Sequence, residues 1–279
     1  MGKQFLNFFV FSSLFIAGGA VLMVHQTNQL LELAPKNNTL LYFVFFSTLT
    51  SYNIHWYFTP FSDAEKIRSQ WTRQFRFVHI IMAIGGAAGA AWFFLSLRNQ
   101  WSWILIGMLL TFLYTAPKLP FEPFSKLKKI AIGKTIYLAS VWTYVTTVLP
   151  ILVSDNSFNT LDLFFCGGRF FLIYCICILF DYRDREQDKK EGIRSFITYF
   201  NEKGIDRLFV ISFLLFVLFT TLLIFYQIIV PYIIILLLPG LLLIVLYQQA
   251  KKNHSDYLYY IVLDGLMMFS SLLTLFMSI

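Results

Sequence analysis

Cysteine, charge and long polar segments are scarce in this chain of 279 residues. Its three cysteines, Cys166, Cys175 and Cys177, lie within one apolar stretch and lack the spacing of metal ligands, so they predict neither a disulfide framework nor a zinc centre. Charged residues make up only 13% of the chain, whereas soluble domains contain about 25%. No Walker loop, nucleophile elbow or glycine-rich nucleotide motif is present. These absences exclude the common classes of soluble nucleotide-dependent and zinc enzymes.

Apolar residues dominate instead, at 58% of the chain, and aromatic residues account for 19%. Crossing a bilayer takes about 20 mostly apolar residues per helix. The run after Lys3 is longer than the apolar core of a signal peptide and further runs follow, so we interpret it as the first span. The sequence predicts an all-α integral membrane protein with one polytopic domain over 1–279 and about nine transmembrane helices, at about 5–26, 39–58, 76–97, 100–116, 130–153, 158–180, 206–227, 229–248 and 256–277.

The basic residues predict the orientation of these helices. Most of the 22 Lys and Arg residues fall in alternate connections, and the remaining outer loops hold only Lys36 and Arg98. By the positive-inside rule, the amino terminus and the loops after the second, fourth and sixth spans face the cytoplasm, as in a bacterial inner membrane protein. The net charge of +7 then reflects topology and anionic lipid headgroups, and we do not expect nucleic-acid binding.

The stretch DYRDREQDKKEG, residues 181–192, concentrates charge directly after the sixth span. If the helix continues, Asp181, Asp184 and Asp188 lie within an arc of about 60° on one face. Carboxylates grouped in this way are unfavourable without a cation, and Mg²⁺ binds one or two carboxylates together with waters and phosphate oxygens. The interleaved cations, Arg183, Arg185, Lys189 and Lys190, could contact phosphate. The alternative is a solvated helix end whose charges pair with one another, and the charge pattern alone favours neither.

The longer segment FDYRDREQDKKEGIRS resembles the second acidic motif of the UbiA-type prenyltransferase superfamily, with Asp181, Asp184, Asp188 and Gly192 at the matching positions. The resemblance implies a UbiA-like helical bundle with its catalytic loops on the cytoplasmic side. It also implies Mg²⁺ as cofactor, a prenyl diphosphate as one substrate and a lipophilic acceptor as the other. The three aspartates would then be the catalytic, metal-binding residues.

A second stretch, FLYTAPKLP, follows the fourth span, and its Tyr114 and Lys118 fit the family's Tyr-x-x-x-Lys element. The resemblance implies that this lysine contacts the diphosphate, and the following segment KLKKIAIGKTIYLASVW is also similar to the family. An ordinary Tyr and Lys pair at the membrane interface is the alternative explanation of FLYTAPKLP.

The first acidic motif of the family is missing. In SYNIHWYFTPFSDAEKIRSQW, Asn53 aligns with the leading asparagine, but the three aspartate positions fall on Ile54, Tyr57 and Phe61. The missing acidic group would have to be replaced by cations that bind phosphate directly. The candidates are His55, Lys66, Arg68 and Lys118, and Asn53 joins them as a candidate substrate contact. An interfacial aromatic belt with hydrogen-bonded polar neighbours is the alternative here.

Three hypotheses follow from these patterns. The first is a UbiA-type prenyltransferase, and the second is a catalytically inactive UbiA-like protein that binds isoprenoid lipids. A small transporter is the third and weakest, because the intramembrane Arg169 and Asp264 suggest an ion pair but no inverted repeat is evident. Gly85 and Gly89 have the small-x-x-x-small spacing of a close helix contact.

Overall fold

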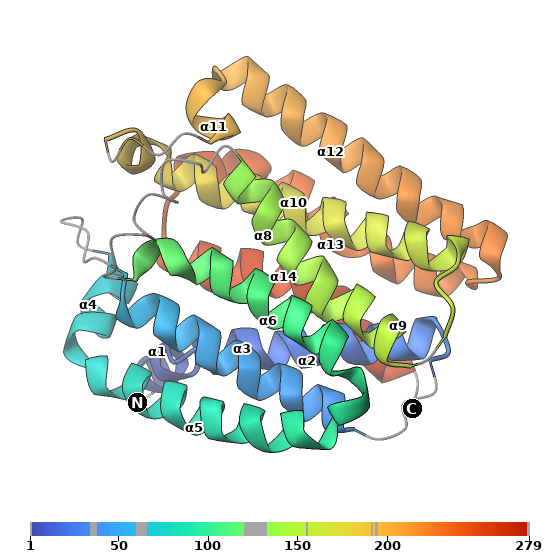
Figure 1. Ribbon diagram of the computed structural model, residues 1–279. Coiled ribbons are helices and arrows are strands. Elements are labelled where there is room, and N and C mark those ends of the chain that lie inside the picture. The colour runs from blue at the N-terminus through green and yellow to red at the C-terminus, as the bar shows by residue number, and fades with distance from the viewer. Residues whose placement is uncertain are drawn as a thin grey trace.

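The computed structural model describes residues 2–33, 38–59, 66–119, 133–154, 156–190, 192 and 195–277. Within these ranges every regular element is a helix (Figure 1), so the prediction of an all-α fold is confirmed. The first half contains α1 (Gly2–Phe11), α2 (Leu14–Leu30), α3 (Thr39–Tyr57), α4 (Ile67–Gln74), α5 (Arg76–Ser96), η1 (Arg98–Gln100), α6 (Trp101–Thr115) and η2 (Ala116–Lys118). The second half contains α8 (Lys134–Thr143), η4 (Tyr144–Val148), α9 (Leu149–Val153), α10 (Thr160–Lys190), α11 (Phe196–Tyr199), α12 (Glu202–Leu222), η5 (Leu223–Tyr226), α13 (Val230–Lys252), η6 (Leu258–Leu263) and α14 (Asp264–Met277).

Six of the described helices are long and apolar enough to cross a membrane, and the bent pair α1 and α2 raises the number to seven. Every stretch predicted as a span contains a helix, but α6 has only 15 residues, and α3, with 19 residues, is long enough but not apolar enough to be counted. The predicted number of nine spans is therefore not confirmed. The apolar helices nevertheless identify the chain as an integral membrane protein.

The first predicted span is broken. Helices α1 and α2 meet at an angle of 60°, and Ser13 between them has a positive φ of 69°. The break removes the Ser12 carbonyl from the helical hydrogen-bond ladder, and the side-chain amide of Asn53 on α3 donates to it at 3.0 Å. A polar residue of α3 thus satisfies a backbone group that the bend would otherwise leave unpaired inside the bundle.

The glycine-rich part of α5 packs closely on α3. A Cβ atom built on Gly89 would lie 2.6 Å from the ring of Phe46, and one built on Gly86 would collide with Thr50. Gly85, by contrast, has open space around it. The predicted close contact is therefore real, but the pair that makes it is Gly86 and Gly89, because Gly85 faces away from α3.

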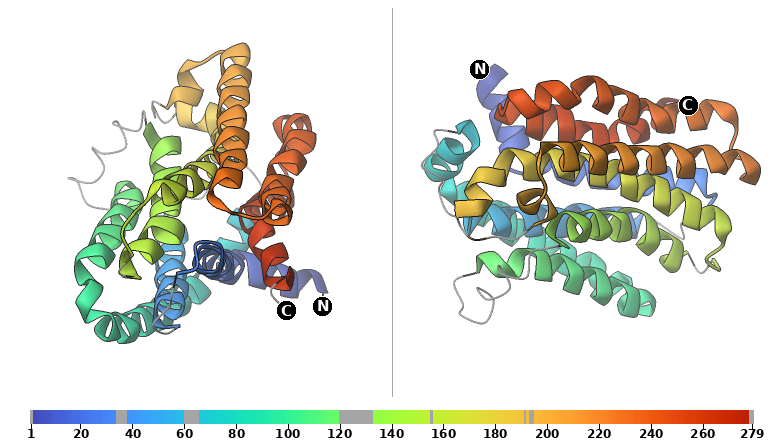
Figure 2. Two further views of the ribbon diagram at one scale, coloured as in Figure 1. Left: turned by 90° about the vertical axis from the view of Figure 1, so that its right-hand side faces the viewer. Right: turned by 90° about the horizontal axis from the view of Figure 1, so that it is seen from above.

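Helix α10 occupies the middle of the bundle, with α8, α12 and α14 around it (Figure 2). Its apolar residues from Leu172 to Leu179 belong to the largest buried cluster. The C-terminal ends of α3, α6 and α10 and the beginning of α8 meet at the left-hand end of the bundle in Figure 1. The helix ends that flank the loops predicted to share one side of the membrane therefore lie at one end of the molecule.

Candidate functional site

The acidic run forms the last turns of α10, which continues without a break to Lys190. Two of its carboxylates are covered, since Asp181 and Asp188 are only 7% and 5% exposed, whereas 32% of the Asp184 side chain remains exposed. Gly192 follows the end of the helix with a positive φ of 70°, the conformation that glycine adopts at helix C-termini. The predicted helical face therefore exists, but its three carboxylates have different surroundings.

The residue that covers the two buried carboxylates is Lys134, the first residue of α8. Its Nζ lies 3.4 Å from Asp181 Oδ1 and 3.2 Å from Asp188 Oδ2. The neighbouring Thr135 hydroxyl donates a hydrogen bond to the other oxygen of Asp181. Two helical turns separate the aspartates and bring them back to within about 20° of one another, so one ammonium group can contact both.

Sequence reasoning missed Lys134 as a site residue. The available signal was a lysine at the start of a span, in the segment KLKKIAIGKTIYLASVW that continues the Tyr114–Lys118 stretch. Its pairing with residues about 50 positions later follows from the packing of α8 on α10 and not from any local pattern.

The third carboxylate, Asp184, is held by cations on two sides. Arg183 donates to it through Nε at 2.9 Å and Nη2 at 3.2 Å, and the Lys66 Nζ lies at 3.4 Å. The Arg183 side chain is itself only 4% exposed, with its guanidinium 4.5 Å from the ring centre of Tyr259 and hydrogen-bonded to the hydroxyl of Tyr260. The carboxylate of Asp184 is therefore held in place by protein cations, Arg183 and Lys66.

The other cations of the acidic run also have protein partners. Arg185 contacts Glu202 at 2.8 Å, and Lys189 contacts Glu186 at 2.9 Å. Arg183 is buried against aromatic rings, as described above. The expectation that Arg183, Arg185 and Lys189 meet phosphate directly therefore receives no support from their positions, since each of the three already neutralises a carboxylate.

A second group of site residues, aromatic and basic, lies at the ends of α3 and α6. The rings of His55 and Tyr114 stack with centres 5.3 Å apart and planes at 8°. The Lys118 ammonium donates to Thr59 Oγ1 at 2.7 Å and lies 5.7 Å from the ring centre of Trp56. The structure thus brings His55 to the Tyr114–Lys118 element, which lies about 60 positions later in the sequence.

Electrostatic interactions connect this aromatic and basic group to the aspartates of α10. Tyr114 interacts with Lys134 and Asp181, and His55 interacts with Lys118 and Lys134. One end of the bundle therefore contains both the aspartates of α10 and the Tyr114–Lys118 element, with Lys134 between them.

Arg68 is enclosed and does not face an open pocket. It is 5% exposed, and its guanidinium carbon lies 3.6 Å from the ring centre of Trp56 and 4.5 Å from that of Tyr260. Its backbone N–H donates to Asp256 Oδ2 at 2.9 Å. Burial lowers the pKa of Arg68 to about 10, so the group stays charged at neutral pH. Its position favours a role in holding α4 against the bundle.

Asn53 is also enclosed. It is fully buried, and its amide donates to the carbonyls of Ser12 and Leu49 at 3.0 and 2.7 Å. Its Oδ1 lies 2.7 Å from His79 Nδ1. Since these contacts occupy the amide on both sides, we do not include Asn53 among the ligand contacts proposed below.

Two of the three aspartates are placed to bind one divalent cation together, but all three do not converge on a single ion. Among the described residues, no group of three or more His, Cys, Asp and Glu side chains converges as a metal site. Asp181 and Asp188, however, already share one cation, the Lys134 ammonium. Two carboxylates are a sufficient protein contribution for Mg²⁺, which completes its shell with water and phosphate. The donor set therefore fits one such ion at Asp181 and Asp188.

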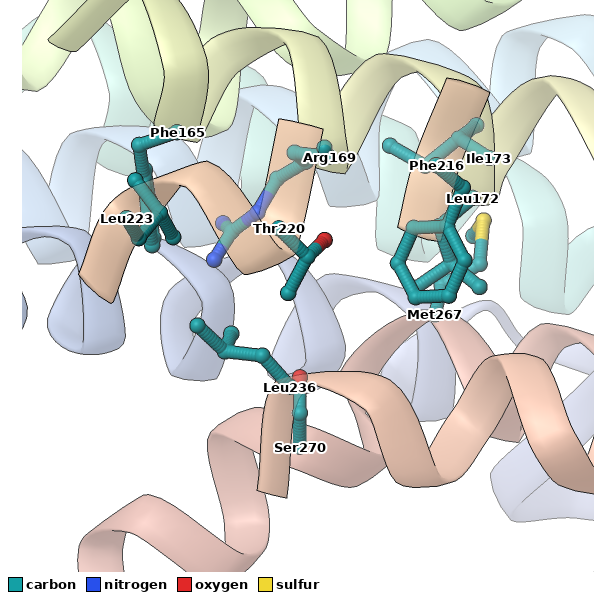
Figure 3. Close-up of a pocket in the computed structure, with 11 residues that line it drawn as sticks. Phe165, Arg169, Leu172, Ile173, Phe216, Thr220, Leu223, Leu236, Met267 and Ser270 are labelled. Atoms are coloured by element: carbon teal, nitrogen blue, oxygen red, sulfur yellow. The ribbon is translucent and has the colours of Figure 1, made fainter. Parts of the chain in front are cut away.

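Arg169, in the middle of α10, lies beside a small pocket lined mostly by apolar side chains (Figure 3) and is held by polar groups of α2. Its Nη2 donates to Gln26 Oε1 at 2.6 Å and its Nη1 to the Met23 carbonyl at 2.8 Å. The predicted pairing of Arg169 with Asp264 is wrong, since no described carboxylate contacts Arg169 and Asp264 interacts instead with Arg68 and Arg183. A small cavity of about 20 Å³ adjoins the guanidinium and is lined by Arg169, Thr220, Ser270, Phe216 and Leu236, enough for about one water molecule.

Comparison with known families gives one match. Residues 72–272 match the model described as the UbiA prenyltransferase family. The matched segment begins after the stretch in which the first acidic motif is missing and includes Tyr114, Lys118, Lys134 and the acidic run. Comparisons with curated proteins and with solved structures found no match.

Proposed function

The chain belongs to the UbiA prenyltransferase family, and we propose that it binds a polyprenyl diphosphate with Mg²⁺ and transfers the prenyl group to a lipophilic acceptor. The observation that carries this proposal is the arrangement around Lys134, whose ammonium lies between Asp181 and Asp188. It supports a cation-binding place on α10, at the end of the bundle that also contains Lys118.

In this proposal Asp181 and Asp188 hold the divalent cation, and Asp184 keeps Lys66 and Arg183 in position. Lys118 and Lys134 contact phosphate oxygens as compact point charges, and the Tyr114 hydroxyl is placed to donate a hydrogen bond. The bound Mg²⁺ would supply charge neutralisation on the leaving diphosphate. The aromatic rings of Trp56 and His55 shield the reacting end of the substrate from water.

The reaction that these residues would support begins with cleavage of the allylic carbon–oxygen bond. The bonding electron pair leaves with the diphosphate, where Lys118 and Lys134 stabilise the charge. The resulting carbocation is attacked by the acceptor, which forms the new bond and releases a proton to solvent. The cytoplasmic side remains the predicted location of these steps, because the loops that adjoin these helix ends in the sequence are the ones rich in basic residues.

The test uses purified protein in detergent, Mg²⁺ and a series of allylic diphosphates, with pyrophosphate release as the readout. We expect release to fall at least about 100-fold in Asp181→Asn and Asp188→Asn, because each loses a metal-binding oxygen. We expect a smaller loss in Asp184→Asn, which acts through Lys66 and Arg183. Release that is unchanged in all three variants would refute the proposal.

The missing first acidic motif favours a second candidate function. The positions where the family has aspartates hold Ile54 and Tyr57 among the described residues, and Phe61 lies outside them. A protein with half of the acidic groups could bind isoprenoid lipids at this site without turning them over. This alternative predicts saturable binding of a prenyl diphosphate, measured by calorimetry, with no pyrophosphate release.

A further inference from the structure

Lys134 occupies the oxygens that a divalent cation at this site would need. Its Nζ lies within 3.4 Å of Asp181 Oδ1 and 3.2 Å of Asp188 Oδ2. Two oxygens bound to one Mg²⁺ can be no more than about 4.2 Å apart, because each bond is about 2.1 Å long. A Mg²⁺ ion bound to these two oxygens would lie no more than about 5.5 Å from the Lys134 Nζ, where two positive charges repel strongly. A cation that binds both carboxylates therefore competes with Lys134 for them.

Among the described residues, the three aspartates and the cations that contact them are balanced without a metal. Asp181, Asp184 and Asp188 are matched by Lys134, Lys66 and Arg183. A prenyl diphosphate adds about three negative charges at neutral pH. One divalent cation would reduce the sum over this group and the diphosphate to one negative charge, whereas a second would make the sum positive.

We propose that Lys134 is a built-in counter-cation that competes with a single divalent metal ion for Asp181 and Asp188, and that Lys66 and Lys134 replace the charge of a second metal. The competition between Lys134 and the metal ion takes place in the protein without substrate. The replacement of a second metal by Lys66 and Lys134 concerns the bound diphosphate and rests on the proposed function. When the metal binds, the displaced ammonium is free to contact the anion that arrives with it.

Two further features support the competition. Thr135, the next residue of α8, donates to Asp181 and keeps that carboxylate next to the start of the helix when Lys134 leaves. Lys134 is also more accessible than its partners, with 29% of its side chain exposed against 9% for Asp181 and 8% for Asp188. The lysine can therefore move away while the carboxylates stay in place.

The experiment is a titration of the purified full chain with Mn²⁺, followed by electron paramagnetic resonance of the free ion, in the absence of any diphosphate. Lys134→Met should bind Mn²⁺ on the order of tenfold more tightly than the unmodified protein, with one ion per chain, because the competing charge is gone. Lys134→Arg should bind it about threefold more weakly or worse, because the guanidinium fork can hold both carboxylates.

The control is Lys189→Met, which removes the same charge from an exposed position on α10, where the ion-pair partner of the lysine among the described residues is Glu186. Screening by solvent should keep its effect below about twofold. Equal or weaker Mn²⁺ binding in Lys134→Met overturns the proposal. If that variant fails to fold, Lys134→Arg decides, and unchanged or tighter binding there overturns it. Absence of pyrophosphate release would refute the proposed function but would leave this titration unaffected.

Discussion

Replacing Arg183 with methionine tests whether the end of α10 depends on a buried ion pair. The change keeps an apolar stem that can pack on Tyr259 and removes the charge that contacts Asp184 through two nitrogens. It also removes the hydrogen bond to the Tyr260 hydroxyl, 3.1 Å away. Asp184 then keeps only the Lys66 ammonium, at 3.4 Å, among the cations that contact it.

The expected cost follows from the burial of the two partners. Removing one member of a fully buried ion pair costs about 3–5 kcal/mol. Arg183 is 4% exposed, but 32% of the Asp184 side chain faces solvent, and Lys66 remains. Screening and the remaining cation lower the expected loss to about 2 kcal/mol. For a chain of this size that corresponds to a fall of about 4 °C in the unfolding temperature.

The assay is thermal unfolding of the detergent-solubilised protein at one fixed scan rate, followed by tryptophan fluorescence. Arg185→Met is the matched control, because its partner Glu202 is 53% exposed and its loss should cost less than about 1 kcal/mol. In the double variant Arg183→Met/Asp184→Asn both charges are gone, so at least half of the stability should return. Equal effects of the two arginine changes, or a double variant less stable than Arg183→Met, would refute the reasoning.

Two more changes test the packing of the first half of the chain. Asn53→Ala removes the side-chain amide that contacts the Ser12 carbonyl and the His79 Nδ1 in the interior. It should lower the free energy of unfolding by about 2 kcal/mol. A loss of pyrophosphate release at temperatures where the variant is fully folded would instead indicate a role in binding. Gly89→Leu should reduce the yield of folded protein, since the new side chain would collide with Phe46. In the control Gly85→Leu the side chain points into open space and should have little effect. Similar yields for the two variants would contradict the assigned contact between α3 and α5.

The local features of the chain were predictable because they depend on residues close together in the sequence. Apolar runs predict helices, and the spacing of Asp181, Asp184 and Asp188 predicts a shared helical face on α10. The same logic fails at the break between α1 and α2, since a long apolar run gives no sign that Ser13 adopts a positive φ. It also leaves the number of spans unconfirmed, since α6 has only 15 residues and α3, although 19 residues long, is less apolar than the helices that qualify as spans.

Pairings between distant residues were not predictable in this way. The partners of Arg169 include Gln26 and the Met23 carbonyl and not Asp264, because the long Arg169 side chain reaches α2. Charge alone made any buried carboxylate a candidate partner, and only the positions of the helices select among them.

By itself, the sequence determined the class of protein, an all-helical membrane protein with basic residues concentrated in alternate loops and an acidic helical face after its sixth apolar stretch. It did so because hydropathy, helical period and charge are properties of short segments. Only the tertiary structure decided that Lys134 meets Asp181 and Asp188, that Arg183 and Lys66 hold Asp184, and that Asn53 supports a bend in another helix. Those choices depend on which helix ends the packing of the bundle brings together, and no local pattern contains that information.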